Sequence, residues 1–209
     1  RFFKYAEKFY CIRAELGKVS DRRKEARIPC ARVVLALFLM ASARLGSLNA
    51  IEQAMKGSSG KAWRDWMGGD LPSADRLGEV AALVELDDMR RVLLGFHRRR
   101  KRKKALPSLP GQLRVLIMDA HEMWTSYRRH SKDALSRTVK VKTRNGEEER
   151  TQYYQRYVAA YLMGKTGRLL LDLEMQQPGE GEIAAAQRLL RRLLTDCPRA
   201  FNVVAGDAL

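Results

Sequence analysis

The spacing of apolar residues changes at Pro107. Before this residue, apolar side chains recur every three or four positions, which is the period of an α-helix. Helices are therefore expected over 1–16, 33–45, 48–56, 76–84 and 87–96. After Pro107, short aliphatic or aromatic runs lie between glycines and prolines, as is typical of strands. The sequence predicts an α+β protein, with an all-helical domain over 1–104 and a second domain over 105–209.

The second domain is expected to hold four strands and one helix. The strands cover 113–118, 153–163, 168–175 and 200–207, and an amphipathic helix covers 180–194. In the third strand, leucines alternate along one face, and Asp172 and Glu174 are expected on the other, solvated face. The polar stretch 126–150 is expected to be a long excursion, with a turn at Asn145-Gly146.

Composition points to a polyanionic partner. The chain carries 40 Lys and Arg against 24 Asp and Glu, a formal net charge of +16, which exceeds what solubility requires. It has no run of about 18 or more uncharged apolar residues, so no membrane partner is expected. The scattered cysteines, Cys11, Cys30 and Cys197, favour a reducing compartment and give no zinc-site spacing. We expect a cytoplasmic, nucleoid-associated protein.

Seven consecutive cations end the helical domain, and they are the strongest candidates for contacting DNA phosphates. They are Arg98, Arg99, Arg100, Lys101, Arg102, Lys103 and Lys104. Binding through such a run depends steeply on salt and reads no base sequence. A solvated linker between domains is the alternative interpretation. In the excursion, Arg128, Arg129, Lys140 and Lys142 are also expected to hold phosphates, and simple exposure is the alternative for each.

Two aspartates lie at the carboxyl ends of apolar strands. Asp119 follows Val115-Leu-Ile-Met118, and Asp207 is the final residue of the last strand. A carboxylate just past a strand lies at a sheet edge, where ligands and metals are commonly held. His121 and Glu122 lie close enough in sequence to orient a metal-bound water, although a structural role is as well supported for His121.

Several short motifs together resemble the DDE transposases of bacterial insertion sequences, which have a ribonuclease H-like core. The motifs are Asp119-Ala-His-Glu122, Tyr153-Tyr-Gln-Arg156, Leu171-Asp-Leu-Glu174, Pro178-Gly-Glu-Gly-Glu182, and Pro198-Arg-Ala-Phe201 with Gly206-Asp-Ala-Leu209. The resemblance covers roughly residues 105–209. It implies a mixed sheet used in the order strand, strand, strand, helix, strand, with the fourth strand parallel to the first. Asp119 and Asp207 would then lie side by side as catalytic residues and metal ligands.

The same resemblance implies a function. Two Mg²⁺ or Mn²⁺ ions about 4 Å apart would support phosphodiester hydrolysis and strand transfer. The partner would be double-stranded DNA, at transposon ends and target, bound by a possible homodimer. The chain begins with Arg1 and not with Met, so it is expected to be an internal piece. The third acid of the family has no matching position, so this truncated piece is expected to be inactive or very weak in catalysis. Two alternatives stay open, namely a noncatalytic DNA-binding protein derived from a transposase and another ribonuclease H-like nuclease.

Overall fold

The computed structural model of the chain describes residues 2–58, 60–128, 130–143, 146–165 and 167–206. The chain divides into two compact units, 1–99 and 100–209, each with its own hydrophobic core. The division lies close to the boundary expected after residue 104.

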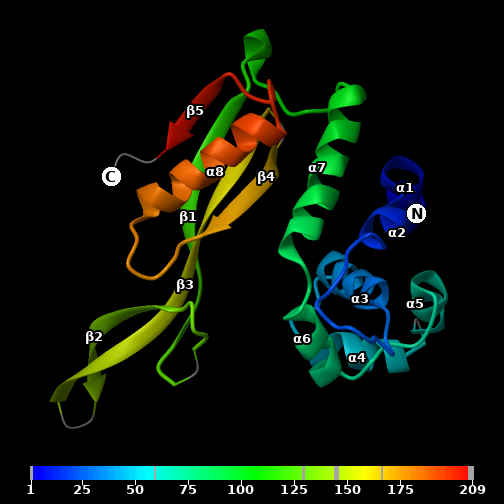
Figure 1. The fold of residues 1–209 in the computed structure, drawn as a ribbon, viewed down its shortest axis with the longest axis horizontal. Coiled ribbons are helices and arrows are strands. Elements are labelled where there is room, and N and C mark those ends of the chain that lie inside the picture. Colours follow the sequence, from blue (N-terminus) through cyan, green and yellow to red (C-terminus); the bar gives the residue numbers. More distant parts are fainter. Residues whose placement is uncertain (1, 59, 129, 144–145, 166, 207–209) are drawn as a thin grey trace. The chain divides into compact units, whose positions relative to one another are not determined.

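Unit 1 is helical (Figure 1). Its helices are α1 (Phe2–Tyr10), α2 (Ile12–Leu16), α3 (Cys30–Ser42), α4 (Leu48–Lys56), α5 (Gly60–Met67), α6 (Ala74–Ala81) and α7 (Leu86–Arg102). α4 has the expected bounds, because the Ser47 hydroxyl accepts the Ala50 N–H at its first turn. α7 is longer than expected and runs through most of the cationic segment.

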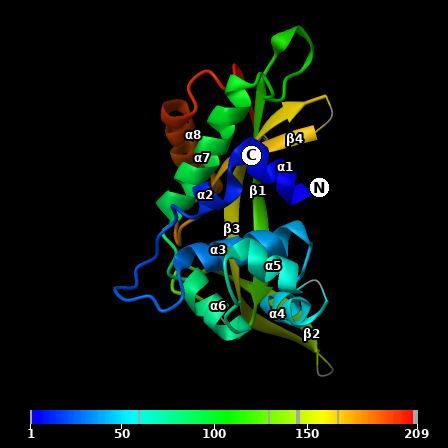
Figure 2. The same ribbon diagram turned by 90° about the vertical axis from the view of Figure 1, so that its right-hand side faces the viewer.

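The core of unit 1 is built around α3, which lies next to α4, α5 and α6 (Figure 2). Val33, Ala36 and Leu39 of α3 are fully buried. Because apolar residues cover most of this helix, it packs on several neighbours at once.

Within its described residues, unit 2 contains five strands and one long helix, which Figure 1 shows. The elements are β1 (Val115–Ser126), β2 (Leu135–Thr143), β3 (Gly146–Gly164), β4 (Gly167–Met175), α8 (Glu182–Asp196) and β5 (Val203–Gly206), with a short 3₁₀ turn at Pro110–Gln112. The sheet is mixed, because β1 pairs with β3 antiparallel and with β5 parallel.

β3 is the strand on which the sheet is assembled. Its 153–162 segment pairs with β1 on one side. On its other side, β2 pairs with 146–154 and β4 with 157–164. The first half of β3 and β2 therefore form an arm that extends beyond the part of the sheet covered by α8 (Figure 1).

The arm corrects the expectation of an irregular excursion over 126–150. β1 continues to Ser126, and β2 pairs with β3 over nine residues up to the Asn145-Gly146 turn region. Asn145 itself lies outside the described residues. The physical reason is that opposite charges face each other across the two strands, since Lys140 lies opposite Glu149 and Lys142 opposite Glu147. Such pairs stabilise strands whose polar sequence is otherwise typical of a loop.

α8 covers one face of the sheet. Leu189 and Leu193 of α8 are almost fully buried and belong to the same core as Leu116, Val158 and Leu162 of the strands. In β1, residues alternate between the two faces, so Leu116 and Met118 face α8 while Asp119 and His121 lie on the opposite face. We call this opposite side the open face.

A β-bulge divides the leucine stripe that the sequence suggested for β4. Asp172 pairs with Ala160 and Leu170 with Tyr161, so Leu171 is the extra residue of β4 at the register shift. Leu171 packs under α8, whereas Leu173 pairs with Ala159 on the open face. Because the bulge shifts the alternation by one residue, Asp172 and Glu174 face α8 and not solvent, and that expectation was wrong.

Candidate metal centre

Asp119 lies in the middle of a strand, not beyond its end. β1 runs to Ser126, and Asp119 pairs with Ala159 of β3. The expected strand end at Met118 was wrong, because β3 is long enough to keep pairing with the polar residues that follow. The Asp119 side chain is 54% exposed on the open face, so it is accessible to a ligand from solvent.

The parallel pairing of β1 and β5 leads toward both aspartates. The register runs from Val115↔Val203 to Met118↔Gly206. Asp119 and Asp207 are the next residues along the two strands, but Asp207 lies outside the described residues. Its position relative to Asp119 therefore remains a prediction.

His121 is brought to Asp119, and Glu122 is not. His121 Nε2 lies 3.6 Å from Asp119 Oδ2, and its ring lies against the rings of Tyr157 and Tyr161 on the same face. Glu122 belongs to the opposite face by the alternation of the strand. There, Arg137 donates two hydrogen bonds of 3.0 Å to its carboxylate. Glu122 is thus held in an ion pair of its own.

The described donors fit a divalent cation only in part. A carboxylate oxygen suits Mg²⁺ or Mn²⁺, and an imidazole nitrogen suits Mn²⁺ better than Mg²⁺. Asp119 and His121 provide one of each. Over the residues that the structure describes, no group of three His, Cys, Asp or Glu side chains is placed to hold a metal ion. A complete site would need further ligands, and Asp207 is the candidate that the sequence offers.

Several other acids of the unit serve as partners for arginines of α8. Arg192 binds Asp172 and Glu174, and Arg188 binds Glu174 and Glu180. The hydrogen bond from Arg188 lowers the pKa of Glu180, although burial opposes this shift. The amphipathic pattern of this helix puts its arginines on the face opposite the leucines, and contacts between them and acids of β4 were not expected from the sequence. Salt bridges from helix to strand were missed because the bulge that turns Asp172 and Glu174 inward leaves no sequence signal.

Part of the cationic run is engaged within the molecule. Arg99 forms an ion pair with Glu15 and contacts the Cys11 sulfur at 3.5 Å. Arg100 donates to the Ala105 carbonyl at 3.1 Å, and Lys101 to the Pro198 carbonyl at 2.9 Å. The exposed members are Arg98, Lys101, Arg102, Lys103 and Lys104. As α7 extends to Arg102, most of the run is helical. The run includes the boundary between the two units at 99 and 100, so the DNA-binding and the linker interpretation both stay open.

The cations of the excursion are differently placed. Arg128 is exposed, and Arg129 lies outside the described residues. Lys140 and Lys142 are exposed but lie opposite glutamates of β3, so the arm has a mixed charge. Both lysines consequently have a structural use in the sheet, and their contact with phosphates stays a prediction.

Comparisons of this chain with protein-family models, curated proteins and solved structures found no match. Within the described part of the chain, no helix is both long and apolar enough to cross a membrane.

Proposed function

We propose that unit 2 is a ribonuclease H-like core and that the protein acts as a DDE transposase. The observation that carries the proposal is the parallel pairing of β1 with β5, whose register ends at Met118↔Gly206, one residue before both aspartates. The antiparallel strands β1, β3 and β4, followed by the crossing helix α8, support the same assignment. β2 and the first half of β3 are an additional arm in this interpretation.

Asp119 and Asp207 are the proposed catalytic carboxylates. Two carboxylates side by side repel each other, which makes a divalent cation their natural partner. A pair of bound Mg²⁺ or Mn²⁺ ions would activate a water or a DNA 3′-hydroxyl and stabilise the leaving oxygen. His121, at 3.6 Å from Asp119, is placed to orient that carboxylate, while Glu122 is occupied by Arg137.

The proposed partner is double-stranded DNA at the ends of a transposon and at its target. The net charge of +16 supports a polyanionic partner, and the exposed cations at the end of α7 supply contacts to phosphates. Synapsis of two ends favours a homodimer on DNA. A cytoplasmic, nucleoid-associated location belongs to the same proposal.

Binding of Mn²⁺ to residues 1–209 tests the metal assignment without relying on catalysis. Titration calorimetry is expected to show at least a tenfold loss of affinity in Asp119→Asn and in Asp207→Asn. Asp133→Asn, which changes an exposed aspartate of the same unit, is the matched control. Equal Mn²⁺ affinity in the wild type and all three variants would refute the proposed site.

A noncatalytic DNA-binding protein is the second candidate. The exposed cations that follow Phe96 favour it, because they need no metal to bind a phosphate backbone. Measuring DNA binding and Mn²⁺ binding together distinguishes the two candidates. If the protein binds DNA while Asp119→Asn and Asp207→Asn leave its Mn²⁺ affinity unchanged, the second candidate is favoured.

A further inference from the structure

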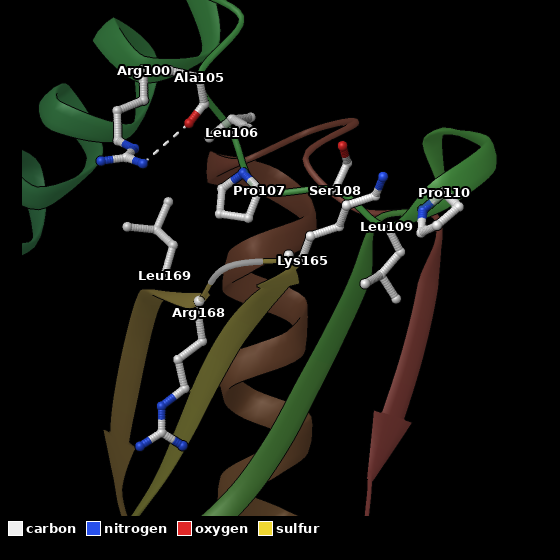
Figure 3. Close-up of a pocket in the computed structure, with 12 residues that line it drawn as sticks. Arg100, Ala105, Leu106, Pro107, Ser108, Leu109, Pro110, Lys165, Arg168 and Leu169 are labelled. Atoms are coloured by element: carbon white, nitrogen blue, oxygen red, sulfur yellow. Dashed lines mark hydrogen bonds between the residues drawn. The ribbon is translucent and has the colours of Figure 1, made fainter.

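A groove of about 630 Å³ lies between the β3–β4 turn and the segment that leads into β1 (Figure 3). Three cationic side chains line it, Arg100, Lys165 and Arg168. None of the described lining residues carries a carboxylate. In this respect the groove differs from the α8–β4 interface, where acids accompany Arg188 and Arg192.

Close packing holds the walls of the groove together. A Cβ atom on Gly164 would lie 2.7 Å from the Pro107 Cβ atom, so only glycine allows the turn and the proline segment to approach this closely. Pro107 and Pro110 restrict the backbone of the facing wall. The groove is therefore formed before any ligand binds.

Arg168 keeps its charge available. Its guanidinium lies over the Tyr161 ring, 4.7 Å from the centroid. Stacking of this kind orients the guanidinium plane but does not neutralise it, and the N–H edges remain able to donate to phosphate oxygens. Lys165 is exposed at the turn and adds a second positive charge beside it.

Arg168 of the groove and Asp119 share the open face of the sheet, whereas Leu106 and Leu169 of the groove pack against the core under α8. The Tyr161 ring, under Arg168, lies 6.2 Å from the His121 ring, and His121 lies 3.6 Å from Asp119. Arg168 pairs with Met163 and Asp119 with Ala159, so the two positions are roughly 13 Å apart along β3. Because β4 and β1 lie on opposite sides of β3, the two positions are also roughly 10 Å apart across it, which gives a separation of roughly 16 Å. About five nucleotides of one duplex strand cover this length.

The side chains spread out and do not converge on a point. Lys165 extends toward Ser108 and Pro110, whereas Arg168 runs along the sheet away from Pro107 (Figure 3). An isolated phosphate ion would be held best by converging donors. Spaced cations match the repeated charges of a phosphate backbone instead.

We propose that this groove binds the phosphate backbone of a nucleic-acid strand that continues along the open face to Asp119. The end point at Asp119 rests on the proposed function, whereas backbone binding in the groove does not. The residues responsible are Lys165 and Arg168, with Arg100 contributing charge at the rim.

The test uses a fluorescently labelled DNA duplex and anisotropy in EDTA, so that no metal contributes to binding. Lys165→Ala and Arg168→Ala are each expected to weaken binding about fivefold and to lower the salt slope by about 0.9, the value for one neutralised phosphate. Lys165→Arg should restore both. Arg191→Ala removes an exposed cation from α8 and serves as the matched control.

The outcomes separate the possible explanations. Equal losses in Arg191→Ala and in the groove variants would overturn the proposal, because net charge alone would then explain binding. Inorganic phosphate that saturates the amide shifts of Gly164, Lys165 and Gly167 at millimolar concentration would also overturn it, in favour of a small-anion site. Groove variants that lose DNA affinity while Asp119→Asn leaves Mn²⁺ binding unchanged would support the groove and refute the proposed metal site.

Discussion

Arg192 of α8 donates a hydrogen bond of 2.7 Å from Nε to an Asp172 oxygen in β4. The same guanidinium donates to Glu174 at 2.6 Å and to the Leu173 carbonyl at 3.0 Å. Burial opposes the charged form of Arg192, but the hydrogen bonds to the two carboxylates outweigh it and raise the pKa of the guanidinium. The helix is thus fixed to the sheet by ionic as well as apolar contacts.

Replacing Arg192 should destabilise unit 2. Arg192→Ala removes the guanidinium that the inward-facing Asp172 and Glu174 bind, and we expect a loss of about 3 kcal/mol, the low end for a buried pair that loses one member. Hydrogen exchange of the β4 and α8 amides measures the change. Arg191→Ala, at the exposed neighbouring position, should change stability by less than about 0.5 kcal/mol. Similar losses in both variants would contradict the structural role of the pair.

Unit 1 should lose stability in acid through Asp21. A hydrogen bond from Arg23 is the largest factor that holds the pKa of the Asp21 carboxyl at about 2, below its ordinary value of 3.8. The lowered pKa stabilises the folded state above pH 4, and this contribution disappears as the pH falls from about 4 to about 2. It amounts to about 2 kcal/mol.

The comparison of wild type with Asp21→Asn isolates this contribution. The variant should be less stable at pH 6, and the difference should vanish near pH 2. Chemical unfolding at several pH values measures it, and Asp65→Asn, at an exposed position of α5, is the control. A stability difference that is independent of pH between 2 and 6 would show that the Asp21 carboxylate is not the group responsible.

His121 and Glu122 should behave differently toward metal. Because His121 lies beside Asp119 and Glu122 is bound by Arg137, His121→Ala should lower Mn²⁺ affinity severalfold, while Glu122→Gln should leave it within about twofold. Glu122→Gln should instead cost about 1 kcal/mol or less, as expected for a partly exposed ion pair. The reverse order of effects on Mn²⁺ would mean that Glu122 leaves Arg137 to reach the site.

The cationic run should separate into structural and DNA-binding members. Alanine at Arg98, Arg102 and Lys104 should reduce the salt slope of DNA binding by up to roughly 0.9 for each phosphate that the variant no longer neutralises. Arg99→Ala should lower the stability of unit 1 and change the slope little, since Glu15 already holds this guanidinium. Anisotropy at several salt concentrations, together with thermal unfolding, distinguishes the two effects. If the variant with alanine at all three positions, Arg98, Arg102 and Lys104, had the same salt slope of DNA binding as the wild type, the run would not take part in DNA binding.

The spacing of apolar residues was sufficient to predict the elements whose burial follows directly from their own sequence. α4 begins after the Ser47 cap as expected. α3 is buried on most sides, because the consecutive residues Val33, Val34, Leu35 and Ala36 are all apolar and buried. The 153–163 part of β3 was found from its aromatic and branched residues, and β4 from its alternating leucines, whereas the first half of β3 was expected to be irregular.

Register and long-range pairing were not predictable. The bulge opposite Ala160 and Tyr161 reverses the faces of Asp172 and Glu174, although the leucine alternation in the sequence runs on without a break. In the same way, β1 extends past Asp119 only because β3, about forty residues later, is long enough to pair with it. Both features depend on a distant partner strand, and a single sequence does not show which residues will become that partner.

The continuity of β3 limits how the arm can change in evolution. Because one strand pairs with β2 up to Tyr154 and with β4 from Tyr157, Gln155 and Arg156 join two registers. Deleting one of these two residues would move the side chains of either the arm or the core part of β3 to the opposite face of the sheet. Deleting both would keep each side chain on its present face. We expect length variation in related sequences to be confined to the arm tip, or to occur at this junction in steps of two residues.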